Sequence, residues 1–120
     1  MKKRILIVED HVDFRTMIKD YLNRSKLGLE IYEASSGEMG VAKASCVKPD
    51  IVLMDINLPN ANGLVTAKTI KEDHPKCAII FLTIFGVEVF KKAAEKIRAK
   101  AFICKNDVYE QLLPEIKKCL

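Results

Sequence analysis

The chain has 120 residues, of which 49% are hydrophobic and 30% are charged. These values are typical of a folded domain with a buried core and exclude an intrinsically disordered chain. The 20 basic and 16 acidic residues give a formal charge of +4, which is too small to indicate nucleic-acid binding by itself. We expect one domain that spans residues 1–120.

The cysteines and the apolar segments indicate a cellular location. The four cysteines are dispersed and have neither metal-ligand nor C-x-x-C spacing. The basic residues 2–4 are followed by only four apolar residues, too few for a signal peptide, and no segment has the length needed to cross a bilayer. We therefore expect a cytoplasmic protein that makes no use of a membrane.

Four apolar runs divide the chain, at residues 5–8, 51–54, 78–82 and 101–104. Short continuous runs with turn or helix signals between them are typical of strands buried in a parallel sheet. A further short strand is predicted over residues 29–34.

The first two helices are predicted from periodicity and from their end signals. Apolar residues recur at helical spacing over residues 14–22, and Gly28 closes that segment. Ser35 and Glu38 have the spacing of a capping box, which predicts the start of the second helix. This helix is expected to end before residues 48–49, because a residue that precedes proline avoids the helical conformation.

Three more helices are predicted in the second half of the chain. The third stops near residues 74–75, and the fourth runs from about Val87 to Ile97. The last is opened by another capping-box pair, Asp107 and Glu110. Pro114 lies inside this helix and is expected to kink or shorten it.

The resulting order is βαβαβαβαβα, without repeats or linkers. This alternation predicts a three-layer, doubly wound α/β domain, since right-handed crossovers place helices on both faces of a parallel sheet. Ligands of such sheets bind in the crevice beyond the carboxyl ends of the strands. The side chains that follow the strands are therefore the candidates for function.

The polar residues at these strand ends suit phosphate chemistry: Glu9, Asp10, Asp55, Thr83 and Lys105. Asp55 is the candidate nucleophile, because a carboxylate can attack a phosphoryl group to form an acyl phosphate. Mg²⁺ prefers oxygen ligands, and the three carboxylates together with a backbone carbonyl, that of Asn57, would supply them. Single acids at strand ends often only cap helices, but three acids at two neighbouring ends repel one another unless a cation lies between them.

The remaining strand-end residues have simpler alternative roles. Lys105 would pair with phosphoryl oxygens or form a salt bridge with Asp55. Thr83 offers a hydroxyl donor, or is an ordinary β-branched residue at the end of a strand. Phe102, taken alone, is a core residue, and His11 is interpreted as an exposed histidine without a catalytic role.

In this order and at these strand ends, the motifs resemble the receiver domain of bacterial two-component response regulators. The resemblance covers essentially the whole chain and rests on residues 7–11, 53–63, 82–83 and 102–105. It implies a flavodoxin-like fold, in which five helices flank a five-stranded parallel sheet of order 2-1-3-4-5.

The resemblance also assigns chemistry to the strand-end residues. Asp55 would accept a phosphoryl group from a sensor histidine kinase. Asp10 and Asp55 would bind Mg²⁺ directly, and Glu9 would bind it through water. Thr83 and Lys105 would hold the phosphoryl oxygens, so the chain would be a phosphoacceptor and not an enzyme with its own substrate.

A switch follows from the same resemblance. Thr83 would move toward the phosphoryl group, and Phe102 would turn inward to fill the space it leaves. This would change the surface formed by the fourth helix, the fifth strand and the fifth helix. Residues 9–15 are most similar to receivers that precede a helix-turn-helix domain, so DNA would be reached only through an effector domain outside this chain. Monomer and phosphorylation-dependent homodimer are both left open.

Several positions depart from the family pattern, and two of them bear on function. Ile84 stands where a small residue is common, and we expect it to narrow access to Asp55. Arg98 stands where glycine is usual, which predicts a strained turn or a different one. Arg98 also belongs to a basic segment, which we interpret as a solvated helix face rather than a surface for an acidic partner: Lys91, Lys92, Lys96, Arg98 and Lys100.

Three alternative functions are compatible with parts of this pattern. A receiver-like binding module that is no longer phosphorylated is favoured by the two departures and opposed by the intact acids, threonine and lysine. An aspartyl phosphatase would need a second acid where Asn57 stands. A flavin-binding protein would need a phosphate loop rich in Ser, Thr and Gly after the first strand.

Overall fold

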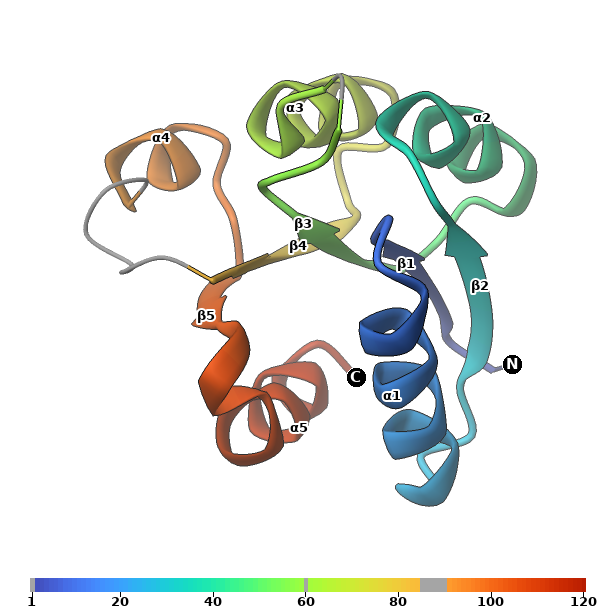
Figure 1. Ribbon diagram of the computed structural model, residues 1–120. Helices are drawn as coiled ribbons and strands as arrows, with labels where there is room; N and C mark the ends of the chain where they lie inside the picture. Colours follow the sequence, from blue (N-terminus) through green and yellow to red (C-terminus); the bar gives the residue numbers. More distant parts are fainter. Residues whose placement is uncertain (1, 60, 85–90) are drawn as a thin grey trace.

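A computed structural model of the chain describes residues 2–59, 61–84 and 91–120 (Figure 1). The strands within these ranges are β1 (Arg4–Val8), β2 (Glu30–Ala34), β3 (Ile51–Asp55), β4 (Ala78–Thr83) and β5 (Ala101–Cys104). The α-helices are α1 (Val12–Arg24), α2 (Gly37–Val47), α3 (Gly63–Asp73), α4 (Lys91–Lys96) and α5 (Val108–Lys118). A 3₁₀ turn over Lys105–Asp107 connects β5 to α5.

The described strands form one parallel sheet of order β2-β1-β3-β4-β5, which confirms the predicted fold. The chain runs outward from β1 to β2 on one side and from β3 to β5 on the other. The order therefore reverses between β1 and β3, where doubly wound sheets bind their ligands. The register pairs Val8 with Met54 and Asp55 with Leu82, so the carboxyl ends of β1, β3 and β4 lie nearly level.

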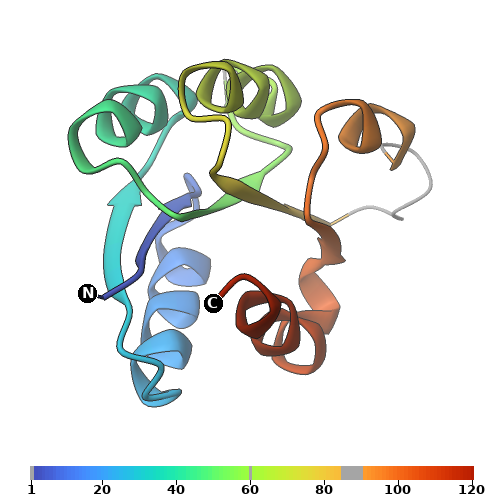
Figure 2. The same cartoon turned by 180° about the vertical axis from the view of Figure 1, so that it is seen from behind.

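Helices cover both faces of the sheet. In Figure 1, α2, α3 and α4 lie on one face and α1 and α5 on the other, and Figure 2 shows the same layers from behind. Successive strand residues point to opposite faces, so Leu6 packs toward α2 and α3 while Ile7 packs toward α1 and α5. Every residue of β3 is buried, which explains why the four residues before Asp55 are all apolar.

The capping prediction for α2 was wrong by one residue. Ser36, not Ser35, caps this helix, and its hydroxyl accepts a hydrogen bond from the Met39 N–H at 3.1 Å. The helix packs closely against its neighbours at Gly37 and Gly40, where a Cβ at Gly40 would lie 3.0 Å from Val8. The sequence pattern alone cannot distinguish two adjacent serines.

The ends of α1 and α5 also differ in detail from the predictions. The helix α1 ends at Arg24, before Gly28, and both Lys26 and Gly28 adopt left-handed backbone conformations. At the start of α5, Asp107 makes no side-chain capping bond, because the 3₁₀ turn runs directly into the helix. The same helix continues through Pro114 to Lys118, so the proline does not shorten it.

The remaining helix predictions agree where they can be compared. The helix α2 ends at Val47, and α3 ends at Asp73, as predicted. The predicted start of the fourth helix at Val87 and residue 60 of the loop before α3 lie outside the described residues. None of the helices described here is long and apolar enough to cross a membrane.

Candidate functional site

Three carboxylates converge beyond the ends of β1 and β3. Glu9 and Asp10 follow β1, Asp55 is the last residue of β3, and one oxygen of each lies within 4.8 Å of the others. These side chains line a hollow of about 440 Å³ together with Lys105 and Ile84. The structure therefore brings the predicted acids together at one place.

The Asp55 carboxylate is held in a defined orientation. Its side chain is 2% exposed, and Oδ1 accepts a hydrogen bond from the Asn57 N–H at 3.0 Å. Oδ2 lies 3.5 Å from the Lys105 ammonium nitrogen, which confirms the predicted salt bridge. One oxygen is thus engaged by the backbone, and the other faces a cation.

Glu9 is an even closer partner of Lys105, which the sequence did not predict. Its Oε1 lies 2.6 Å from the Lys105 ammonium nitrogen, and its Oε2 accepts a hydrogen bond from the His11 N–H at 3.1 Å. Burial raises the pKa of Glu9 to about 7; the hydrogen bond from Lys105 opposes this rise, and the negative charge of Asp55 adds to it. The carboxyl therefore binds a proton readily when no other cation is close.

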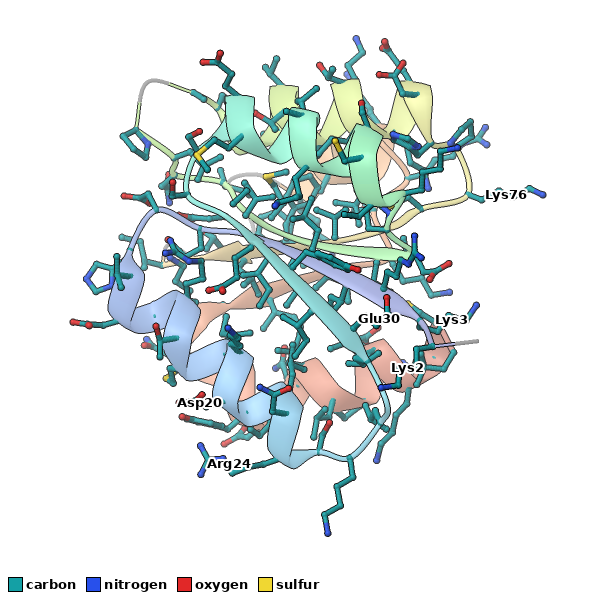
Figure 3. All side chains as sticks on the ribbon, turned by 90° about the vertical axis from the view of Figure 1, so that its right-hand side faces the viewer. Lys2, Lys3, Asp20, Arg24, Glu30 and Lys76 are labelled. Atoms are coloured by element: carbon teal, nitrogen blue, oxygen red, sulfur yellow. The ribbon has the colours of Figure 1, made fainter. Side chains whose placement is uncertain are left out.

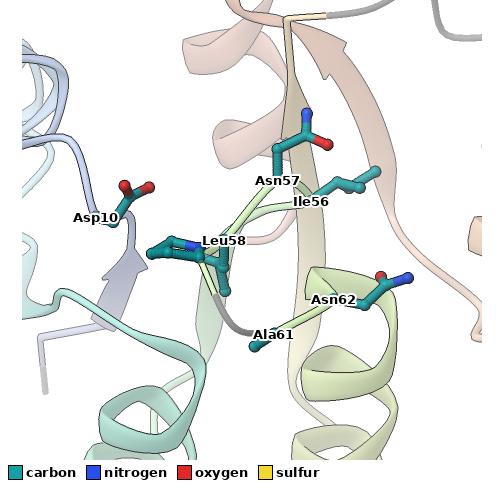
Figure 4. Close-up of a pocket in the computed structure, with 7 residues that line it drawn as sticks. Asp10, Ile56, Asn57, Leu58, Ala61 and Asn62 are labelled. Carbon is teal, nitrogen blue, oxygen red and sulfur yellow. The ribbon is translucent and has the colours of Figure 1, made fainter.

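The donor set fits a divalent cation. With all groups ionised, three carboxylates and one ammonium leave a formal charge of −2, and hard oxygen donors are what Mg²⁺ prefers. Figure 4 shows Asp10 just past β1, across an adjoining hollow of about 420 Å³ from Asn57. Asp10 and Asn57 are exposed, so they are accessible to an incoming ion.

Two further residues of α1 support this cluster, and the sequence analysis assigned neither to the site. The ring of Phe14 lies 4.5 Å from the Lys105 ammonium nitrogen, a cation–π contact that helps to position the lysine. Arg15 donates to the Glu9 carbonyl at 2.7 Å and forms a salt bridge with Glu33. The feature of the sequence that could have indicated these two residues is their position, about one helical turn after Glu9 and Asp10.

The residues predicted to switch and the residue predicted to limit access differ in their burial. Thr83 ends β4 and is fully buried, whereas the next residue, Ile84, is 60% exposed and lines the hollow beside Asp55. Phe102 is half-buried on β5, with its ring centroid 5.9 Å from that of Phe81. His11 is exposed, as expected, and its Nδ1 accepts the Phe14 N–H at 3.3 Å, which caps α1.

Gly63 has a role at the site that the sequence pattern did not indicate. It begins α3 directly against the backbone that carries Asp55, and a Cβ there would lie 2.1 Å from the Asp55 carbonyl oxygen. Its N–H donates to the Ile56 carbonyl at 2.9 Å. Only glycine allows this close approach.

The fold and the acidic cluster define a class of signalling domain, and comparison with known proteins identifies it. A family model described as the response regulator receiver domain matches residues 5–117. The chain therefore belongs to the family of response regulator receiver domains, as the sequence motifs predicted.

Individual relatives include both short and longer regulators. The chain is 41% identical over 106 residues to the chemotaxis protein CheY of Thermotoga maritima, which covers 88% of this chain and 87% of that protein. It is 31% identical over 109 residues to the nitrate/nitrite response regulator NarL of Escherichia coli, which covers 91% of this chain but 50% of that one. A similar solved structure is the Thermotoga maritima response regulator TrrA in complex with Mg²⁺-BeF. Its TM-score is 0.87 at 30% identity, and the match covers 98% of this chain and 99% of that one.

Proposed function

We propose that this receiver domain is a phosphoacceptor and that Asp55 accepts the phosphoryl group. The observation that carries the proposal is the setting of the Asp55 carboxylate. It is buried, oriented by the Asn57 N–H, contacted by Lys105, and open on one side to the hollow beyond β3. This is how an enzyme or acceptor presents a carboxylate nucleophile in a fixed direction.

The transfer would move a phosphoryl group from a phosphohistidine of a sensor kinase. A carboxylate oxygen of Asp55 forms a bond to phosphorus as the phosphorus–nitrogen bond breaks, and the histidine ring leaves with the electron pair. Lys105 lies close enough to Asp55 to stabilise the charge on the transferred oxygens. Thr83, at the end of the adjacent strand β4, would donate a hydroxyl to the same oxygens.

The carboxylates of Asp10 and Asp55 would bind Mg²⁺ directly, with Glu9 in the outer shell and the Asn57 carbonyl as a further ligand. When bound, the cation offsets the repulsion between the carboxylates and the incoming phosphoryl group. The solved structure of TrrA is described as a complex with Mg²⁺-BeF, which supports this choice of metal.

The output would be a change of surface rather than a reaction on another substrate. Thr83 would shift toward the phosphoryl group, and Phe102 would turn inward, which alters the face formed by α4, β5 and α5. Relatives of two kinds carry such a domain, the chemotaxis protein CheY and the longer regulator NarL. We propose a cytoplasmic signalling role, with any contact to DNA made only through an effector domain outside this chain. A homodimer formed on phosphorylation is one way in which the altered face would act.

Intact mass after incubation with acetyl phosphate and Mg²⁺ tests the acceptor. We expect one base-labile phosphoryl adduct, absent from Asp55→Asn and absent when EDTA replaces Mg²⁺. Asp50→Asn is the matched control, because Asp50 is an exposed acid at the opposite edge of the sheet, and it should retain the adduct. An adduct that persists in Asp55→Asn would overturn the assignment.

Substitution of Ile84 tests the prediction that this side chain narrows access to Asp55. Ile84 is exposed and lines the hollow, so Ile84→Ala should increase the rate of adduct formation by small donors several-fold. Phosphotransfer at an unchanged rate would show that Ile84 does not limit access. If neither protein is labelled by acetyl phosphate or by a phosphorylated kinase, the chain is a binding module of the same fold.

A further inference from the structure

A second hollow lies at the opposite edge of the sheet, where the strands begin and the helices end. It measures about 390 Å³ and is lined by six basic side chains, which we call the basic hollow: Lys3, Lys71, Lys76, Arg98, Lys100 and Lys118. Figure 3 shows Lys3 and Lys76 on this same edge of the molecule. The strands β1 and β3, each of five residues, run from this hollow to the acidic site, so the two sites lie about 16 Å apart.

The basic hollow concentrates the charge of the chain. Its six basic groups face one lining acid, Asp50, so its formal charge is +5, whereas the whole chain carries +4. One carboxylate oxygen of Asp50 accepts a hydrogen bond from the Arg4 backbone N–H at 2.9 Å. Among five hollows compared in the described part of the chain, this one has the largest positive charge.

Most of these cations are not neutralised within the protein. Lys118 pairs with Glu115 at 3.2 Å, and Lys71 donates to the Cys77 carbonyl. Among the residues that the structure describes, the other four basic groups form no salt bridge: Lys3, Lys76, Arg98 and Lys100. The two thiols in the lining add no negative charge at neutral pH, because burial raises the pKa of both Cys77 and Cys119.

Favourable helix-end electrostatics explain only part of this arrangement. Basic residues at the ends of α3 and α5 complement the partial negative charge of those helix ends, and Lys71 and Lys118 fit that account. Lys3, Lys76 and Lys100 do not, since they precede β1, β4 and β5. These two helix ends together contribute about −1 charge, which leaves the hollow strongly positive.

Arg98 adds an independent observation. Its backbone has a φ of 63°, a left-handed conformation that costs a non-glycine residue stability. Glycine would occupy this turn without strain, yet the residue present is an arginine that lines the hollow. Strain at such a position points to a role for the side chain.

We propose that the basic hollow is a binding site for a polyphosphate group, such as the triphosphate of a nucleotide or inorganic triphosphate. A compact, multiply charged anion matches cations that converge from five separate segments on one concavity. Lysine ammonium groups act as point charges for phosphate, and the guanidinium of Arg98 can bind two oxygens at once. A nucleic-acid backbone would instead require an extended basic strip.

Calorimetric titration with inorganic triphosphate, in EDTA and at low salt, tests the site. We expect 1:1 binding that Lys100→Gln and Arg98→Gly each weaken at least tenfold. Lys68→Gln removes the same charge from the exposed face of α3, outside the hollow, and should change the affinity less than twofold. Equal weakening by Lys68→Gln, or no binding at millimolar triphosphate, would overturn the proposal.

Arg98→Gly also separates binding from structure, since relief of the left-handed strain should raise the melting temperature while affinity falls.

Backbone amide chemical shifts of the unsubstituted protein then locate the anion. They should change at residues 76–78 and 98–100 and not at residues 9–10 and 55–57. The reverse pattern would place triphosphate in the acidic site and refute the basic hollow. Parallel titrations with ATP and AMP distinguish the two sources of the anion. A higher affinity for ATP than for inorganic triphosphate would indicate a nucleotide, and an equal or lower affinity would indicate an inorganic anion.

Discussion

Glu9 and Asp55 are both almost fully buried, and both contact the ammonium group of Lys105. One positive charge therefore balances two carboxylates, and the exposed carboxylate of Asp10 lies close by. Because the cluster is short of positive charge, a proton on Glu9 or a bound cation stabilises it. This shortage is the reason why we expect the site to respond to the proposed metal.

The raised pKa of Glu9 predicts how stability depends on pH in the absence of metal. Its pKa is about 7 in the folded state and 4.5 in the reference state, so between these values the folded state binds the proton and the unfolded state does not. The free energy of unfolding should therefore fall as pH rises from about 4.5 to 7, by up to about 1.4 kcal/mol per pH unit.

Urea denaturation in EDTA across this pH range checks the prediction. Glu9→Gln should flatten the profile, because glutamine does not titrate, whereas the exposed control Glu38→Gln should keep the wild-type slope. A profile that is unchanged in Glu9→Gln would show that another group controls the slope.

The start of α3 illustrates how a secondary-structure element serves the site. Asn62 caps this helix, its side-chain oxygen accepting the Leu64 N–H at 2.8 Å, and Gly63 presses against the backbone of Asp55 and Ile56. The helix thus holds the end of β3 in place from one side.

Substitution of Gly63 tests this contact. Gly63→Ala would place a Cβ 2.1 Å from the Asp55 carbonyl oxygen, so the backbone must move, and we expect a loss of about 3 kcal/mol with slower labelling of Asp55. Gly28→Ala is the control, since Gly28 has a φ of 70° but no atom within 4 Å of the added Cβ. It should lose only about 1 kcal/mol and be labelled normally. Equal losses in the two variants would contradict the steric explanation.

At the scale of the whole molecule, the two edges of the sheet carry opposite charge. The carboxyl-terminal edge gathers acids around Asp55, and the amino-terminal edge gathers the lysines and the arginine of the basic hollow. Both arrangements follow from the parallel sheet, which brings all strand ends of one kind to one edge. Ligands of opposite charge at the two edges would each stabilise the fold by binding only its folded form.

Magnesium should therefore raise the free energy of unfolding. At one hundred times its dissociation constant, a ligand of the folded state alone adds about 2.7 kcal/mol. Asp10→Asn should lose this gain, because it removes a proposed direct ligand, whereas Asp20→Asn, exposed on α1, should retain it. Thermal denaturation with and without Mg²⁺ measures the difference, and an undiminished gain in Asp10→Asn would remove that residue from the metal site.

The local sequence was enough to predict the element order, the layered fold and the acids at the strand ends. Apolar runs and helical periodicity are properties of neighbouring residues, and the topology of a parallel sheet then brings Glu9, Asp10, Asp55 and Lys105 to one edge. Of the two outcomes expected at Arg98, a strained turn or a different one, the structure has the strained, left-handed turn.

Other features depended on the tertiary structure. The need for glycine at position 63 and the preference of Lys105 for Glu9 each depend on atoms from other segments of the chain. The basic hollow is the clearest case, since its cations are scattered from Lys3 to Lys118 and no local pattern connects them. Periodicity specifies which face of a helix or strand is buried, but only the packed chain determines which side chains of different elements contact one another.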